Sequence, residues 1–276
     1  MKVALITGAS SGIGRATAQH LMAKGYHVYG TSRKVEGSFS EGHSDSDPKS
    51  GGFIDMIPMD VTCDTSVEVA VKTVLAKEGR IDVLVSNAGT GIAGAIEDTS
   101  IDEAKSQFET NFFGSLRVIQ AILPIMREQC SGKIIAISSV AGVISIPYQA
   151  HYSASKYAME GLIEALRYEI AAFGIKVCLV EPGDTKTGFT HSRNIAERSI
   201  ETSPYHDRFQ KSLARMEHDE QNGASPDKVA KVIYAMIRKK SPPVRVTVGF
   251  QYKAVLFLKR LLPSGVLEKI VGMLYN

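Results

Sequence analysis

KVALITGASSGIG, residues 2–14, is the stretch that decides the fold. An apolar, β-branched run ends in a glycine-rich loop, and residues 13–24 continue with apolar side chains at three- and four-residue spacing. A strand, a tight loop and a helix in this order bring backbone N–H groups and a helix N-terminus to a place where a pyrophosphate can bind. We expect Gly8 to permit the tight turn, Gly12 to let a phosphate approach, and Gly14 to let the helix pack closely on the strand.

The same alternation of strand and helix continues along the chain. Apolar runs that are mostly continuous, as in parallel strands buried on both faces, follow at 27–31, 53–59, 81–86, 133–138, 175–180 and 244–248. Segments with helical spacing of apolar residues lie between them at 65–78, 102–129, 152–173 and 226–240. This pattern predicts an α/β, doubly wound Rossmann-type fold with a seven-stranded, mainly parallel sheet and helices on both faces.

One interval breaks the alternation. Residues 35–52 are rich in Gly, Ser and Asp where a crossover helix would be expected, and we predict a flexible loop there. Residues 1–250 are predicted to form a single dinucleotide-binding and catalytic domain. Within it, the polar segment 188–224 carries apolar residues at intervals, which favours short helices that form a substrate lid.

The last residues, 251–276, are predicted to be a C-terminal helical extension of two amphipathic helices broken at Pro263. The favoured interpretation is that they pack over the lid or against a partner subunit. Peripheral contact with a membrane surface, through the interspersed lysines and arginine, is the less favoured alternative.

Composition excludes several classes of protein. The formal net charge is only +3, from 32 basic and 29 acidic residues, which makes nucleic acid a poor candidate as a partner. Cys63, Cys130 and Cys178 are spaced too widely for a zinc site or a disulfide framework, so no metal is expected. No signal-peptide core and no run of about 18 apolar residues occurs. A cytoplasmic location is expected.

The end of the second strand indicates which dinucleotide binds. Thr31-Ser32-Arg33 lies where an NAD enzyme usually carries an acid that holds the ribose 2′-hydroxyl. Arg33 instead offers a fork of donors that matches a phosphate, and Ser10, Ser32 or Arg15 could add hydrogen bonds. NADP(H) is therefore preferred over NAD(H). The alternative is that Arg33 is a solvated surface charge.

Further motifs follow in a definite order. They are TGASSGIG at 7–14, NAG at 87–89, Asn111, Ser139, Tyr152 with Lys156, and Pro182-Gly183. In order and approximate spacing they resemble the short-chain dehydrogenases/reductases, over residues 2 to about 250. The branch that the chain resembles most is the one that contains the 17β-hydroxysteroid dehydrogenases. The resemblance implies a nicotinamide-dependent oxidoreductase, and we expect a homodimer or homotetramer.

The resemblance also implies a set of cofactor contacts beyond Gly8, Gly12 and Gly14. These are Ser10, Ser11, Ile13, Ser32, Arg33, Asp60, Val61, Asn87, Ala88, Gly89, Tyr152, Lys156, Pro182, Gly183, Thr185 and Thr187. Two positions depart from the family pattern. Ser86 stands where Asn often precedes NAG, and Thr185 stands where Val or Ile is usual.

Tyr152 and Lys156 are four residues apart in a helical pattern, so they share one face. A phenol has a pKa of about 10, and a nearby ammonium would lower it by favouring the phenolate. We therefore expect Tyr152 to transfer the proton to or from the substrate oxygen, with Lys156 as its electrostatic partner. Taken alone, the pair would indicate only an amphipathic helix with a snorkelling lysine.

Ser139 lies thirteen residues before Tyr152 and could hold the same substrate oxygen, with Ser138 as the neighbouring competitor. The resemblance favours Ser139, because the family's serine-to-tyrosine spacing fits it better. It also implies that Asn111 interrupts its helix locally and holds a water in a proton relay beyond Lys156.

The stretch from Val140 to Tyr148 is apolar and is predicted to line the mouth of the pocket, with Val140, Ala141, Val143, Ile144, Ile146, Pro147 and Tyr148. The expected substrate is a small apolar ketone, aldehyde or secondary alcohol. Steroid, retinoid, fatty-acyl and xenobiotic compounds all fit this description. A noncatalytic NADP(H)-sensing regulator and a 3-oxoacyl thioester reductase are the alternative functions.

Overall fold

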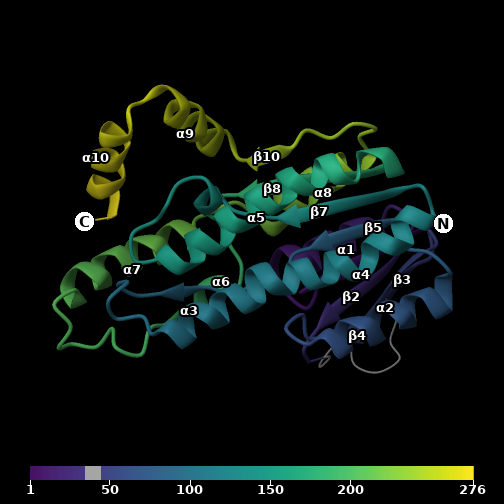
Figure 1. Ribbon diagram of the computed structural model, residues 1–276, viewed down its shortest axis with the longest axis horizontal. Coiled ribbons are helices and arrows are strands. Elements are labelled where there is room, and N and C mark those ends of the chain that lie inside the picture. The colour runs from purple at the N-terminus through teal and green to yellow at the C-terminus, as the bar shows by residue number, and fades with distance from the viewer. Residues whose placement is uncertain (35–44, 276) are drawn as a thin grey trace.

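One large sheet organises the chain in the computed structural model, which describes residues 1–34 and 45–275 (Figure 1). The strand order is β10-β8-β7-β5-β1-β2-β4-β3. The parallel strands are β1 (Lys2–Thr7), β2 (Tyr26–Ser32), β4 (Gly52–Pro58), β5 (Val83–Ser86), β7 (Gly132–Ile137), β8 (Ile175–Pro182) and β10 (Arg245–Val248). They confirm the predicted strands and the doubly wound Rossmann-type arrangement.

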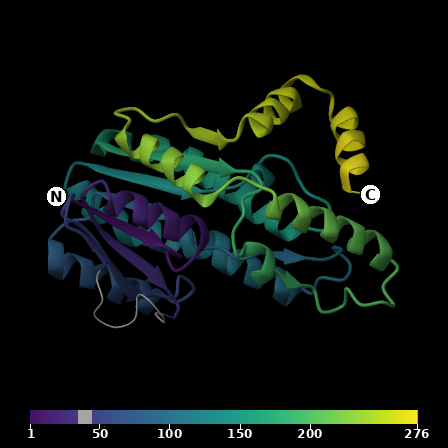
Figure 2. The ribbon, with the colours of Figure 1, turned by 180° about the vertical axis from the view of Figure 1, so that it is seen from behind.

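Helices cover both faces of this sheet, as Figures 1 and 2 show from opposite sides. α1 (Gly12–Met22) and α8 (Pro226–Arg238) pack together on one face. α2 (Asp64–Glu78), α4 (Gly114–Glu128) and α5 (Ala150–Glu169) cover the other. The sheet is thereby buried on both sides, as continuous apolar strands require.

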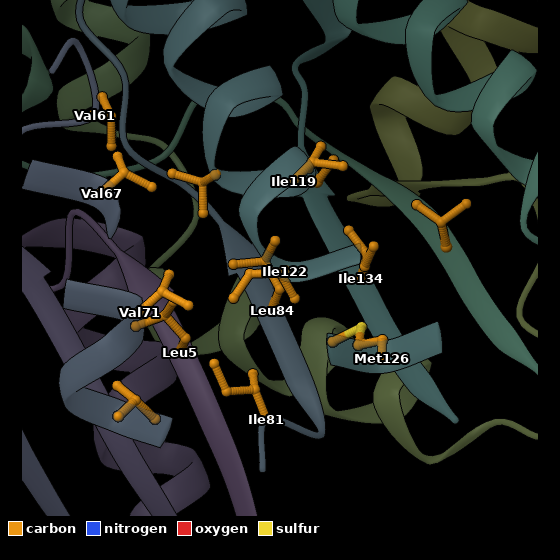
Figure 3. Close-up of a cluster of buried hydrophobic side chains, with 14 of the residues drawn as sticks. Leu5, Val61, Val67, Val71, Ile81, Leu84, Ile119, Ile122, Met126 and Ile134 are labelled. Carbon is orange, nitrogen blue, oxygen red and sulfur yellow. The ribbon is translucent and has the colours of Figure 1, made fainter. Parts of the chain in front are cut away.

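β1 divides its side chains between the two cores. Val3 and Leu5 join the cluster under α2, α4 and α5, and Ala4 and Ile6 join the cluster under α1 and α8. The alternation follows from the two-residue period of a strand. Figure 3 shows the first cluster, in which Leu5, Leu84 and Ile134 on the strands face side chains of the covering helices.

The sheet has an eighth strand that the sequence pattern did not predict. β3 (Asp45–Asp47) pairs antiparallel with β4 at the edge of the sheet. It lies inside the interval 35–52 for which a flexible loop was predicted, and residues 35–44 of that interval lie outside the described part. An edge strand needs neighbours on one side only, so polar residues such as these suffice to form it.

The segment 188–224, predicted to be a lid, and the C-terminal tail add elements beyond the sheet. Between β8 and α8 lie α6 (Phe189–Ser192), β9 (Asn194–Ile195) and α7 (His206–Gln221), and β9 pairs in parallel with β6 (Ile92–Ala93). The tail forms α9 (Phe250–Leu261) and α10 (Ser264–Tyr275), which are the two helices predicted on either side of Pro263. In the described residues, no helix is both long and apolar enough to span a bilayer.

Candidate active site

A cleft of about 1200 Å³ opens at the carboxyl ends of the parallel strands. It lies at β1, where the strand order reverses. From β1 the sheet grows through β2 and β4 on one side, and the next strands of the chain, β5 and β7, are added on the other side of β1. Ligands of doubly wound folds bind at such a switch point. The same edge of the sheet therefore gathers side chains from several loops.

The glycine-rich loop is held in the conformation that its sequence predicts. Gly8 and Gly12 have φ of +65° and +52°, in the left-handed region that favours glycine. A Cβ on Gly14 would stand 2.2 Å from the carbonyl oxygen of Gly8, so only glycine lets the helix pack this closely. Gly14 accordingly lies behind the cleft and does not line it.

A buried threonine fixes this loop to the neighbouring strand. The Thr7 hydroxyl accepts hydrogen bonds from the backbone N–H groups of Asn87 and Ala88, each at 2.8 Å. The Asn87 side chain donates to the carbonyl of Thr7 at 2.9 Å. The sequence reasoning missed Thr7, although its place as the last residue of the first strand, directly before Gly8, was a usable signal.

Arg33 lies at the far end of the cleft, directly after β2. Across from it, the Asp60 carboxylate accepts hydrogen bonds from the backbone N–H and the hydroxyl of Thr62, at 2.9 and 2.8 Å. The Thr62 backbone hydrogen bond is the main cause that lowers the pKa of Asp60, and the Arg33 charge adds to it. Arg33 is exposed at the cleft edge.

The other predicted cofactor contacts come together in this cleft. It is lined by Gly8, Ser10, Ser11, Gly12, Ile13, Ser32, Arg33, Asp60, Val61, Asn87, Ala88, Gly89, Tyr152, Lys156, Pro182, Gly183, Thr185 and Thr187. Thr187 also abuts the glycine loop, since a Cβ on Gly12 would stand 3.3 Å from it. The glycine loop and the N-terminus of α1 fit the pyrophosphate of a dinucleotide, and the Arg33 cation fits a further phosphate group.

Tyr152 and Lys156 project from α5 into the middle of the cleft. Lys156 is buried, and its Nζ donates a hydrogen bond of 2.9 Å to the carbonyl oxygen of Ile137 at the end of β7. Nζ stands 5.8 Å from the centroid of the Tyr152 ring. The predicted shared face is therefore confirmed.

The predicted lowering of the Tyr152 pKa is wrong for this structure. Burial raises the pKa of Tyr152 to about 12, because the phenolate loses solvation, and the nearby Ser139 hydroxyl opposes that shift only in part. Burial also lowers the pKa of the Lys156 ammonium to about 8. Desolvation is the largest cause for both groups, and Tyr152 holds its proton at neutral pH.

The two candidate serines turn to different partners. Ser139 begins the short helix at 140–142, where its Oγ accepts a hydrogen bond of 3.1 Å from the backbone N–H of Ala141, and it lies close enough to Tyr152 to act on its pKa. Ser138 is almost fully buried and acts on the pKa of Glu160 instead. The geometry favours Ser139 beside the phenol.

Asn111 lies beneath the cleft, in a π-helical turn, Glu109–Phe113, that separates α3 (Ile101–Phe108) from α4. The local helix interruption expected at this residue is confirmed. Its Oδ1 accepts from the Thr90 backbone N–H at 2.8 Å, and its Nδ2 donates to the Thr90 carbonyl at 3.0 Å and to Ser155 Oγ at 3.2 Å. These bonds connect the turn to α5, one residue before Lys156.

The segment 188–224 packs directly against this site. The Phe189 ring lies 5.7 Å from the Tyr152 ring, and behind it the Arg193 guanidinium forms a buried ion pair with Glu220. Thr190 donates to the same carboxylate at 2.6 Å. No sequence pattern predicts this ion pair, because its partners lie 27 residues apart in a polar stretch.

The apolar stretch after Ser139 meets the prediction in part. Val140, Ala141, Ile144 and Ile146 line the cleft, whereas Val143, Pro147 and Tyr148 do not. The Val143 carbonyl is occupied by the side chains of Tyr157 and Lys259, and the Tyr148 ring packs 5.6 Å from Phe209 in α7. These contacts place Val143 beside the tail and Tyr148 beside α7.

The tail closes one side of the cleft, as favoured from the sequence. α10 contacts α7, and the tail contributes four apolar residues to the lining, namely Val255, Leu267, Ile270 and Val271. The Tyr252 hydroxyl accepts a hydrogen bond of 3.0 Å from the backbone N–H of Asp184. The Tyr252 ring lies so close over Gly183 that a Cβ there would stand 2.2 Å from it.

Comparison with known proteins identifies the architecture. A family model described as short chain dehydrogenase matches residues 2–198. The chain belongs to the short-chain dehydrogenase/reductase family. It is therefore an oxidoreductase of a family that uses nicotinamide cofactors, and its placement beside the 17β-hydroxysteroid dehydrogenases stays a prediction.

Individual members of the short-chain dehydrogenase/reductase family match nearly the whole chain. A 3-ketodihydrosphingosine reductase of Bacteroides thetaiotaomicron is 45% identical, over 99% of this chain and 98% of its own. An NADPH-dependent 3-dehydrocapnine reductase of Ornithobacterium rhinotracheale is 32% identical, over 98% and 96%. A crystal structure of a short-chain dehydrogenase from Streptomyces avermitilis superposes with a TM-score of 0.79 at 34% identity, over 99% and 96%.

Proposed function

We propose that this chain is an NADPH-dependent reductase that converts the 3-keto group of a long-chain amino lipid, of the 3-ketodihydrosphingosine type, to the alcohol. The observation that carries the reductive chemistry is the half-buried Tyr152 beside Lys156 and Ser139 in a cleft that begins at the glycine loop. NADPH, when bound, supplies the hydride.

The chain's own residues handle the oxygen and its proton. With a pKa of about 12, Tyr152 is a poor base at neutral pH but carries a proton that it can give to a developing alkoxide. Ser139 is placed to hold the same oxygen, since it acts on Tyr152. Lys156, with a pKa of about 8, is largely protonated at pH 7 and would stabilise the phenolate left after the transfer.

Asn111 is proposed to support the supply of the next proton. Its hydrogen bond to Ser155 connects the π-helical turn to the helix that carries Tyr152 and Lys156. A fully buried amide that is bonded to backbone and to Ser155 holds this region rigid. Its role is therefore one of positioning, and a water held by it would complete the relay.

The preference for NADPH rests on Arg33. Its guanidinium lies at the cleft edge beyond β2, where a 2′-phosphate would gain a charge-assisted hydrogen bond. Asp60, the acid opposite, is already bonded to Thr62. The similarity to a relative named as NADPH-dependent agrees with this preference.

The substrate class rests on the lining of the cleft and on the relatives. Apolar side chains from the tail, among them Leu267 and Val271, suit a long hydrocarbon chain. Asp184, Asp219 and Glu220 line the same cleft, where Asp219 is paired with Arg215 and Glu220 with Arg193. Asp184 accepts a hydrogen bond from the neutral Tyr252 hydroxyl, so it is the carboxylate that favours a substrate with an ammonium group, such as a sphingoid base. The relative that is 45% identical carries the name of a 3-ketodihydrosphingosine reductase.

The test is oxidation of NADPH by the purified protein with four ketones. They are 3-ketodihydrosphingosine, its N-acetyl derivative, a 3-oxoacyl thioester of equal chain length and a C19 ketosteroid. We expect the amino ketone to give the highest kcat/KM, and acetylation to lower it, because acetylation removes the positive charge that would face Asp184.

Other results would redirect the assignment. A preference for the thioester would make the chain a 3-oxoacyl thioester reductase. Equal rates with the acetylated ketone would show that Asp184 does not recognise the amino group. Tight NADPH binding with no turnover of any ketone would favour a noncatalytic NADP(H)-sensing regulator.

Analytical ultracentrifugation of the same preparation tests the expected homodimer or homotetramer. A reducing cytoplasm suits the three free thiols, and fractionation of cells would test that location.

A further inference from the structure

α9 has an inner face that fastens it to the domain. Tyr252 bonds to the loop after β8, and the Lys259 ammonium donates to the Val143 carbonyl and, at 3.2 Å, to the Tyr157 hydroxyl. Because Tyr252 and Lys259 are seven residues apart, they lie on one side of the helix. The opposite side is therefore turned away from the domain.

That opposite side is apolar. Phe250, Phe257, Leu258 and Leu261, which we call the outer stripe, are 87, 61, 48 and 65% exposed. Their spacing of seven, eight and eleven residues from Phe250 places them on one face of the helix. A surface helix normally turns its apolar face inward, so an outward stripe indicates a surface that another partner covers.

α10 extends this apolar surface toward the cleft. Val266, Ile270 and Met273 are 43, 43 and 82% exposed, at a spacing that also gives one helical face. Ile270 lines the cleft as well. Both views show the two helices standing off the layered domain, at the end far from the N-terminus (Figures 1 and 2). The exposed apolar surface is thus continuous with the substrate cleft.

Positive charge accompanies the stripe. Lys253 and Arg260 are exposed and seven residues apart, so they follow one edge of it. Residues 250–276 contain four basic residues and one acid, a net charge of +3 that equals the net charge of the entire chain. An exposed apolar helix face with lysine and arginine beside it is the pattern of helices that lie in the headgroup region of a bilayer.

We propose that the outer stripe and the exposed face of α10 dock this protein on an anionic lipid bilayer, with the cleft opening toward the membrane. A second copy of the chain is the less suitable partner, because an isologous contact through the stripe would bring Lys253 and Arg260 of both copies together. Docking would bring the bilayer against the side of the cleft that α10 lines. The proposed docking does not depend on the identity of the substrate, and it can be tested without any substrate.

Co-sedimentation of the full-length protein with vesicles tests the proposal. One set of vesicles is phosphatidylcholine, and the other contains phosphatidylglycerol as well. We expect binding to the anionic vesicles, about tenfold weaker binding to phosphatidylcholine alone, and release by salt. Phe257→Glu with Leu261→Glu should weaken binding at least about tenfold, because it puts two charges into the stripe.

Two further variants separate the contribution of the positive charges from that of the apolar stripe and provide a control. Lys253→Glu with Arg260→Glu should abolish the preference for anionic vesicles while the stripe remains. Val69→Glu with Tyr168→Glu is the matched control, since these residues are 63 and 83% exposed on α2 and α5, and it should bind as the parent does. NADPH titration of every variant shows whether the fold is retained, since neither Phe257 nor Leu261 lines the cleft.

The proposal is overturned if the parent protein stays in the supernatant with anionic vesicles. It is also overturned if the stripe variant sediments as the parent does, or if that variant converts a dimer to a monomer in size-exclusion chromatography without changing sedimentation. The last result would assign the surface to a second copy. Loss of ketone reduction with vesicle binding intact would reject the proposed function and leave the docking surface in place.

Discussion

Replacing Lys156 by methionine should make the protein more stable at neutral pH while it abolishes turnover. Burial lowers the pKa of Lys156 from 10.5 to about 8. Since one pKa unit corresponds to about 1.36 kcal/mol, keeping this ammonium charged in the folded chain costs about 3 kcal/mol at pH 7. Methionine has a side chain of similar length and no charge, so Lys156→Met removes that cost.

The pH dependence gives the sharper readout. Between pH 8 and pH 10.5 the folded chain has already released the proton that the unfolded chain still binds, so the stability of the parent rises with pH in this window. The desolvation cost falls from about 3 kcal/mol at pH 7 to below about 1 kcal/mol at pH 10. The lost hydrogen bond to the Ile137 carbonyl offsets part of the gain at both pH values and cancels in their difference.

Urea unfolding followed by circular dichroism at pH 7 and pH 10 measures the effect. The free energy of unfolding of Lys156→Met minus that of the parent should fall by about 2 to 3 kcal/mol between the two pH values. Lys72→Met, at a side chain that is 74% exposed, is the control and should show no such change. A difference that is the same at both pH values would refute the reasoning that burial of the ammonium destabilises the fold.

Three further predictions concern the cofactor, the proton and the loop. Tyr152→Phe should lower kcat about 100- to 10,000-fold while the Kd for NADPH, measured by fluorescence, stays unchanged; retained turnover would remove Tyr152 from proton transfer. Arg33→Asp should shift the ratio of kcat/KM for NADPH over NADH by about 10- to 100-fold toward NADH, and an unchanged ratio would make Arg33 a plain surface charge. Gly14→Ala should lower the free energy of unfolding by about 1 to 3 kcal/mol, because its Cβ would stand 2.2 Å from the Gly8 carbonyl. Gly161→Ala in α5, where a Cβ meets nothing within 4 Å, should instead add about 0.5 to 1 kcal/mol, and equal thermal midpoints for the two variants would contradict the packing argument.

The elements that the sequence predicted well are those with a strong local signal. The parallel strands are continuous apolar runs, and the glycines of the loop have no alternative residue that would fit their backbone and packing. The prediction that Tyr152, Lys156 and Ser139 lie together came from the order of the motifs shared with the family. Residues far apart in the chain meet only through the topology of the sheet, which no local pattern encodes.

The features that escaped prediction depend on tertiary contacts. β3 is a polar edge strand with no apolar pattern of its own, and the Arg193–Glu220 ion pair joins two positions of a polar lid. The direction of the Tyr152 pKa depends on burial, which spacing alone does not reveal. The outward face of α9 was equally hidden, because an amphipathic pattern does not say which side meets the domain.

The contact between Tyr252 and the loop after β8 ties the tail structurally to the body that carries the sheet. An aromatic ring from the first turn of α9 is seated over Gly183, and its hydroxyl receives the next backbone N–H. A deletion that begins at residue 250 would therefore disturb the loop after β8, which lines the cleft, as well as remove the outer stripe. Exchanging tails among homologues should for the same reason carry substrate preference with it, so that changes in this terminus and in residues 182–187 are expected to be inherited together.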